Sequence, residues 1–332
     1  MDASPNALVS LPSLLAVCLL FVLPTAGHAD APLPPLPEGN TGLAAKYPGD
    51  VGIENDPAVV LHADFEDCRT TADLHSTWDN IVHVGNMRIV EGAPNVHSGR
   101  KSLEIAIPKQ DQALSVNVEK ILPAPHTRDV LFLRYYLKFD PGFDIPRNSC
   151  HDGGSISAGY WSGPSAGPGK RADGRNKFLA SFETEIGSPG NPPSPGPLNV
   201  YIYYPEQRGD YGDHFYPSGI VMPNTSLPGD FGPHFAPRPD FVPERGRWYC
   251  FEYMLKANTP GQRDGRVACW VDGKLIADFP NLRFRDIDSL KIDRFGVGLY
   301  IAKNTIRENK EWYDDVVAAT SYIGPRIVAE RR

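Results

Sequence analysis

Short runs of alternating apolar and polar residues recur along this 332-residue chain and constrain its fold more than any other feature. Turn-forming Gly- and Pro-rich stretches separate the runs, and the spacing typical of an amphipathic helix is nearly absent. With 33 prolines the chain also disfavours long helices. We therefore predict an all-β fold, a two-sheet antiparallel β-sandwich with long Pro/Gly-rich loops. The runs cover residues 59–66, 102–107, 113–118, 130–139, 177–186, 198–204, 247–257, 266–273, 290–301 and 311–319.

The N-terminus resembles an export signal. Residues 8–23 are almost wholly apolar, and small residues up to Ala29 suit cleavage there. We expect a secreted or periplasmic protein, and no later stretch is apolar for long enough to cross a bilayer. The predicted organisation is a signal peptide at 1–29, a Pro-rich lead-in at 30–57 that is either a tether or strand-poor, a single domain at 58–325 with a loop insertion at 187–243, and a tail at 326–332.

Charge and cysteine content limit which binding partners and which cellular compartment suit this chain. The formal net charge of -7 argues against nucleic acid, which requires a basic face. We expect a monomer. Outside the signal peptide there are four cysteines, an even number that favours disulfides in an oxidising compartment, with the pairing left open. These disulfide candidates are Cys68, Cys150, Cys250 and Cys269.

Alternation also predicts which side chains share a face. Three of the runs place apolar residues on one face and ionisable or aromatic ones on the other. Such a polar face is a groove for a polar polymer, and we predict a polysaccharide partner. The polar sets are Arg134, Tyr136 and Lys138; Lys177, Ser181, Glu183 and Glu185; and Asn199, Tyr201 and Tyr203.

The C-terminal third carries motifs of a known family. The segments RGRWYCFEYMLKANTPGQRDGRVACWVDG, LKIDRFGVGLYI and EWYDDVVAA resemble the closing strands of the alginate-lyase-like jelly rolls of polysaccharide lyase family 14. Upstream, DFED, HSGRKSLEI and LRYYLKFDPGFD resemble that family's opening strands more loosely. The resemblance implies a concanavalin A-like jelly roll, β-elimination of a uronate polysaccharide, and no required cofactor.

The family's site motifs map onto this chain with two departures. Its Y-x-Y motif matches Tyr201 and Tyr203, implied to be base or acid. Its S-x-R motif reads Ser181-Phe182-Glu183, so an acid replaces the arginine. Its GGK motif reads Gly153-Gly154-Ser155, without the lysine. We predict that His151 is a second base or neutralises the substrate carboxylate. The predicted substrate-binding residues are Arg134, Lys138, Lys177, Ser181, Glu185, Asn199 and Trp161.

Two other classes of function stay open. Glu183 and Glu185 share a strand face at a spacing compatible with the acid/base pair of a glycoside hydrolase. A non-catalytic carbohydrate-binding module would use the same polar face, with Trp161 stacking on a sugar.

A structural calcium site is the one metal prediction. Acids gather near the first strand and near the last, and first and last strands are often neighbours in jelly rolls. Glu66 and Asp315 are the main candidate ligands, in the company of Asp64, Asp67 and Asp314.

Overall fold

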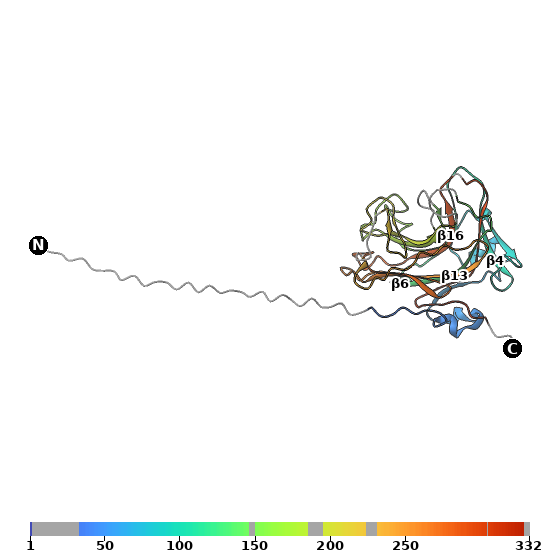
Figure 1. Cartoon of the computed structure of the whole chain (residues 1–332), viewed down its shortest axis with the longest axis horizontal. Coiled ribbons are helices and arrows are strands. Elements are labelled where there is room, and N and C mark those ends of the chain that lie inside the picture. The colour runs from blue at the N-terminus through green and yellow to red at the C-terminus, as the bar shows by residue number, and fades with distance from the viewer. Residues whose placement is uncertain (2–32, 146–149, 185–194, 224–230, 304, 329–332) are drawn as a thin grey trace. The chain divides into compact units, whose positions relative to one another are not determined.

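The computed structural model describes residues 33–145, 150–184, 195–223, 231–303 and 305–328 (Figure 1). The chain from Pro35 onward forms one compact unit. Met1–Pro34 form a separate unit that lies almost wholly outside the described residues, so the predicted signal peptide is among them. In the described part, no helix is long and apolar enough to cross a membrane.

Two antiparallel sheets make up the domain, as the alternation predicts. Among the described residues, sheet A has eight strands in the order β15-β14-β13-β6-β17-β4-β3, with β1 also paired to β17. Its first and last strands are therefore neighbours, as expected. The strands are β1 (Val59–Ala63), β3 (Met87–Glu91), β4 (Lys101–Ile107), β6 (Val130–Phe139), β13 (Trp248–Lys256), β14 (Gly265–Val271), β15 (Lys274–Leu282) and β17 (Asn309–Ala319).

Sheet B lies over sheet A and carries the candidate site. Its described strands follow the order β12-β11-β10-β9-β8-β16-β5-β2, and β7 pairs with β16. The predicted insertion thus contributes the sheet edge β10–β12 between loops. The strands are β2 (Asn80–Val82), β5 (Leu114–Ile121), β7 (Cys150–His151), β8 (Gly154–Ala158), β9 (Phe178–Thr184), β10 (Leu198–Tyr203), β11 (Asp213–Phe215), β12 (Val221–Met222) and β16 (Arg294–Ile301).

The core between the sheets confirms the predicted faces. Apolar side chains that alternate along β6, β9 and β10 point into it, and all are buried. Their neighbours in sequence occupy the outer faces of the two sheets, because successive side chains of a strand point to opposite sides. The inward residues are Leu133, Tyr135, Leu137 and Phe139; Phe178, Ala180 and Phe182; and Leu198, Val200 and Ile202.

The lead-in packs on the outer face of sheet A. Its residues from Pro35 to Pro57 form no strand, and Leu43 and Ile53 bury against Trp270 of that sheet. Figure 1 shows its short helical turns beneath the layer of β6 and β13. The described helices are all 3₁₀: η1 (Leu43–Lys46), η2 (Pro48–Asp50), η3 (Ile53–Asn55), η4 (Thr71–Ser76) and η5 (Val84–Asn86).

The disulfide prediction is wrong for the four candidate cysteines. No disulfide joins Cys68, Cys150, Cys250 and Cys269, and all four are buried. Cys269 points into the core between the sheets, whereas Cys250 lies beside Arg134 and Tyr136 on the outer face of sheet A. Side chains on opposite faces of one sheet cannot be joined without moving the backbone. Burial raises the pKa of both thiols, which keeps them unreactive.

Candidate active site

A row of polar side chains crosses the outer face of sheet B because neighbouring strands are in register. Ser155 of β8 lies opposite Ser181 of β9. Ser181 in turn lies opposite Tyr201 of β10, and Tyr201 opposite His214 of β11. Two residues further along β9, and so on the same face, Glu183 pairs with Asn199. The two departures from the family motifs, at positions 155 and 183, therefore lie on the same face as Tyr201.

A carboxylate and two imidazoles form the centre of this face. The Nδ1 atom of His151 lies 2.9 Å and 3.0 Å from the two oxygens of Glu183. The Nδ1 atom of His214 lies 2.9 Å from Oδ1 of Asn199 and 3.6 Å from Glu183. An ionised carboxylate only accepts, so His151 donates from Nδ1 and its neutral ring has its basic nitrogen at Nε2. The contact with Glu183 thereby fixes the orientation and the tautomer of the His151 ring.

Tyr201 packs against both imidazoles. Its ring centroid lies 4.7 Å from that of His151 and 4.5 Å from that of His214, in stacked geometry. The backbone N–H of Gly212 donates to its hydroxyl at 3.1 Å, and the hydroxyl of Tyr203 lies 3.3 Å away. Burial, followed by the neighbouring Tyr203, raises the pKa of Tyr201 strongly. Tyr201 therefore stays protonated and is poorly suited to act as a phenolate base.

Two further groups have pKa values set by burial. Burial, assisted by the charge of His151, lowers the pKa of His214 to about 3, so this ring stays neutral at ordinary pH. Burial raises the pKa of Asp152 to about 6, although the backbone N–H and the hydroxyl of Thr184 both donate to its carboxylate. Asp152 thus ties β9 to the segment that carries His151.

A cavity of about 860 Å³ opens over this face. His151, Ser155, Ser181, Tyr201 and His214 line it, whereas Glu183, Asn199 and Tyr203 lie behind its wall. Strand β16 contributes two glycines to the lining, and a Cβ at Gly298 would meet that of Asn117 at 2.4 Å. Because these positions lack side chains, the cavity floor extends from β8 across to Asn117 on β5.

Aromatic side chains form the rim of the cavity. Trp161 is 48% exposed and Tyr211 is 62% exposed, and both line the opening. Tyr160 meets the Trp161 ring edge to face at 4.9 Å between centroids. The Lys177 ammonium lies 5.0 Å from the ring centres of both Tyr160 and Tyr203. The buried Lys177 thus packs against Tyr160 and Tyr203 on the inner side of the rim.

The predicted cationic substrate-binding residues do not line this cavity. Arg134 and Lys138 project from the outer face of sheet A. Arg134 is fully buried against Asp50, and Lys138 donates to Pro94 O and Asn95 Oδ1. Alternation correctly placed Arg134 and Lys138 on the outer face of their strand. That face belongs to sheet A, however, and both side chains are buried there.

Of the remaining predicted binding residues, Trp161 and Ser181 reach the cavity. Lys177 is buried, and its ammonium donates to the carbonyl oxygens of Ser165 and Gly167. Asn199 contacts His214 from behind the wall. Glu185 lies outside the described residues, so the Glu183/Glu185 hydrolase pair is untested.

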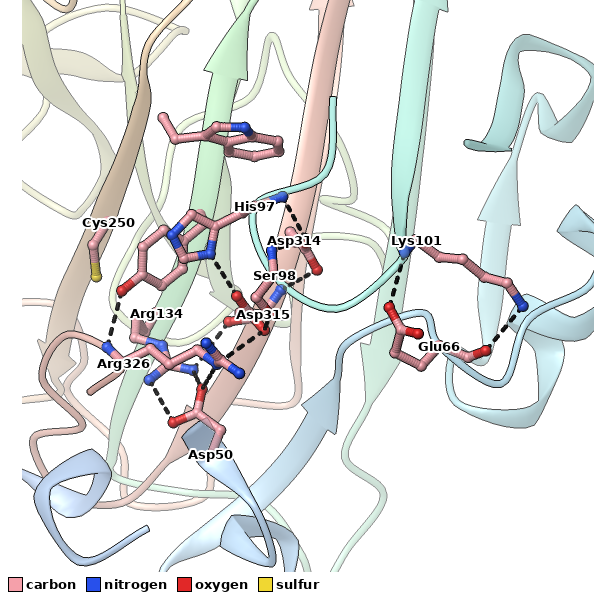
Figure 2. A network of polar contacts seen from close by, with 12 residues as sticks. Asp50, Glu66, His97, Ser98, Lys101, Arg134, Cys250, Asp314, Asp315 and Arg326 are labelled. Carbon is pink, nitrogen blue, oxygen red and sulfur yellow. Dashed lines mark hydrogen bonds and ion pairs between the residues drawn. The ribbon is translucent and has the colours of Figure 1, made fainter. Parts of the chain in front are cut away.

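The predicted calcium ligands belong to separate contacts. Asp314, Asp315 and His97 form the one group among the described residues whose ligand atoms all lie close enough for a metal, within 4.8 Å, and Glu66 is not part of it. Figure 2 shows Glu66 to one side, where its carboxylate accepts from the backbone of Lys101. The calcium site stays a prediction.

Protein donors already fill the Asp314–Asp315 group. His97 Nδ1 lies 2.6 Å from Asp315, Ser98 donates to both acids, and backbone N–H groups donate to Asp314. Arg134 links the group to Asp50 by donating to the carbonyl oxygen of Asp315 (Figure 2). The observed role of this group is to join the last strand to the lead-in.

Sequence reasoning missed His214, Asn117 and Tyr211. His214 alternates with the buried Asp213 and Phe215 on a three-residue strand, which is too short for periodicity to identify. The signal that was available is its place in the chain, just after the run at 198–204 that carries Tyr201.

Sheet order, sandwich core and open polar face together define an alginate-lyase-like jelly roll. The sequence matches no family model and no curated protein. Among solved structures, the chain is similar to a double mutant of alginate lyase Aly36B in complex with alginate tetrasaccharide. The two are 16% identical, the match covers 81% of this chain and 98% of that chain, and the TM-score is 0.54. Alginate lyase vAL-1 from Chlorella virus is 13% identical over 80% of this chain and 100% of that chain, with a TM-score of 0.52. At these identities the likeness establishes the fold.

Proposed function

We propose that the protein is a secreted polysaccharide lyase that cleaves a uronate-containing glycan by β-elimination. The observation that carries the proposal is the His151–Glu183 pair beside Tyr201 on the floor of the cavity. A fold shared with alginate lyases supports it as analogy. β-Elimination requires a base for the proton next to the carboxylate, an acid for the leaving oxygen, and donors for the carboxylate.

The chain offers a group for each requirement. Nε2 of His151 takes the C5 proton, and the electron pair of the C5–H bond forms the C4=C5 double bond. The C4–O4 bond breaks, and its electron pair leaves on O4. Tyr201 donates its hydroxyl proton to the departing O4. Exchange with water then removes the proton from His151 and returns one to Tyr201, so the cycle balances. Hydrogen bonds from Asn117, Ser155 and Ser181, which all line the cavity, would stabilise the carboxylate as its charge spreads.

The hydrolase alternative has less support from the geometry. Glu183 is 1% exposed, and its oxygens are engaged by His151. A hydrolytic acid or nucleophile must reach the glycosidic bond itself.

The test mixes the purified protein with a panel of uronate polymers and neutral glucans. Ultraviolet absorbance follows the unsaturated uronate, and a second assay follows new reducing ends. We expect both signals to rise together. His151→Gln and Tyr201→Phe should each lower kcat by about 10²–10⁴-fold, because each removes a proton-transfer group. His75→Gln, at an exposed histidine outside the cavity, is the matched control.

Other outcomes would refute the proposal. Reducing ends without absorbance would establish a hydrolase, and Glu183→Gln would then be the decisive variant. Binding without either signal would establish a carbohydrate-binding module.

A further inference from the structure

We propose that the cavity takes a glycan whose 4-linked uronates are separated by uncharged sugars, and that a polyuronate is a poor substrate. This inference rests on the proposed function and specifies its substrate class. It follows from the charge of the cavity lining, from the aromatic rim, and from the small set of groups able to receive one carboxylate.

The lining lacks the cations that a polyuronate requires. Among the described residues that line the cavity there is no Lys and no Arg. The lining does include two acids, Glu119 and Asp152. By sequence, the internal segments outside the described residues hold one further cation, Arg147. The nearby Lys177 is turned away from the cavity, with its ammonium capped by two carbonyl oxygens.

A polyuronate would bring a carboxylate into this cavity at every sugar. Removing a carboxylate from water is costly unless a charge or several hydrogen bonds replace the water. The acid Glu119 adds repulsion, although Arg294 donates to it at 2.8 Å and offsets part of its charge. Several successive uronates therefore bind weakly here, whereas uncharged neighbours do not incur this cost.

The rim offers surfaces that suit uncharged sugars. Trp161 and Tyr211 expose large aromatic faces at the opening, and Tyr300 extends the aromatic surface past His151, 5.5 Å away between ring centroids. An aromatic face packs on the apolar C–H face of a sugar ring without needing a charge. Tyr160 fixes the Trp161 ring, and Lys177 fixes Tyr160, so the platform is pre-formed.

One carboxylate can be received at the centre of the floor. Ser155 and Ser181 are direct cross-strand neighbours and both line the cavity. Ser115 donates to Oδ1 of Asn117 at 3.0 Å, which leaves the amide N–H₂ of Asn117 as its donor toward the cavity. Gly298 of β16 pairs with Asn117 and lies between Asn117 and β8. Because Gly298 has no side chain, it does not cover the Asn117 amide. Three uncharged donors match one carboxylate and cannot serve a row of them.

The experiment compares two classes of polymer with the same protein. Hyaluronan and gellan supply 4-linked uronates spaced by uncharged sugars, whereas alginate, polyglucuronate and polygalacturonate are polyuronates. We expect kcat/KM, measured from the unsaturated product, to be at least about tenfold higher on a spaced polymer. KM on that polymer should change less than about twofold between roughly 0.05 M and 0.5 M NaCl, because no cationic lining is screened.

A charge-restoring variant sharpens the comparison. Ser155→Lys places an ammonium on the cavity floor, at the position where the sequence departs from its family motif. It should raise kcat/KM on polyuronates by about tenfold and make KM there salt-dependent. Ser155→Met has similar length without charge and should do neither. The dependence of KM on salt is measured on the unmodified protein. The inference can therefore still be tested if Ser155→Lys misfolds.

The outcomes separate the two proposals. Polyuronates cleaved as well as spaced polymers, or a KM that rises steeply with salt, would overturn the inference and leave the lyase intact. No unsaturated product from any polymer would refute β-elimination. Binding to the same panel then tests the preference for spaced uronates by itself. Tighter binding to the spaced polymers supports the preference. Tighter binding to the polyuronates, or binding to neither class, overturns it.

Discussion

Replacing Arg134 by Met should destabilise the fold and leave substrate handling unchanged. The Arg134 guanidinium is fully buried and donates to the carboxylate of Asp50 and to the carbonyl oxygens of Gly324 and Asp315. Asp50 is 2% exposed, so the variant leaves a buried carboxylate without its main partner. Breaking one side of such a pair costs about 3–5 kcal/mol. Arg326, 4.0 Å from Asp50, offers partial replacement, which favours the lower end of that range.

Urea unfolding followed by tryptophan fluorescence measures this loss. The control is Arg247→Met, which breaks an ion pair with Asp272 whose side chains are 53% and 45% exposed. That exposed pair should contribute less than about 1 kcal/mol. Arg134→Met with unchanged stability would refute the reasoning from burial. A tenfold rise in KM at unchanged stability would restore the substrate-binding role that the sequence predicts for Arg134.

Three further predictions concern the site. Burial raises the folded-state pKa of Asp152 from 3.8 to about 6, so its contribution to stability is full below about pH 4 and is lost as pH rises through 6. The difference in unfolding free energy between wild type and Asp152→Asn should therefore fall by about 3 kcal/mol from pH 4 to pH 7, and a flat difference would contradict the assignment. Gly298→Ala should cost about 1–3 kcal/mol in urea unfolding, because its Cβ would meet that of Asn117 at 2.4 Å. Gly85→Ala, with nothing within 4 Å, should cost less than about 0.5 kcal/mol, and equal costs would count against the packing argument. Trp161→Ala should raise KM about tenfold with little change in kcat, since one stacked face is worth about 1.4 kcal/mol; a fall in kcat alone would argue against a platform.

The faces of individual strands were predictable because the signal is local. Along β9 and β10 the period of two separates Phe182 and Ile202 in the core from Ser181 and Tyr201 outside. That local pattern correctly placed Ser181 and Tyr201 on one face. His151 was placed near the site by its position in the segment that replaces the family's GGK motif.

Which polar face is open was not predictable from the same pattern. Arg134 and Tyr201 show identical alternation, yet one faces a packed layer and the other a cavity. The difference depends on Asp50, 84 residues before Arg134, and on Asp315, 181 residues after it. Alternation within a strand carries no information about such distant segments. The disulfide prediction failed for a related reason, since the even count of cysteines says nothing about the faces they occupy.

The layer under sheet A joins the two ends of the domain to each other. Leu43 and Ala44 donate backbone hydrogen bonds to Tyr322 and Ile323, and Gly49 donates to Ile327. During synthesis the lead-in emerges about 280 residues before these partners, so it has no partner until nearly the whole chain is made. Contacts of such long sequence separation form late in folding. Without these contacts the layer would not close over sheet A, and the buried charges of Asp50 and Arg134 would face water in an otherwise complete sandwich.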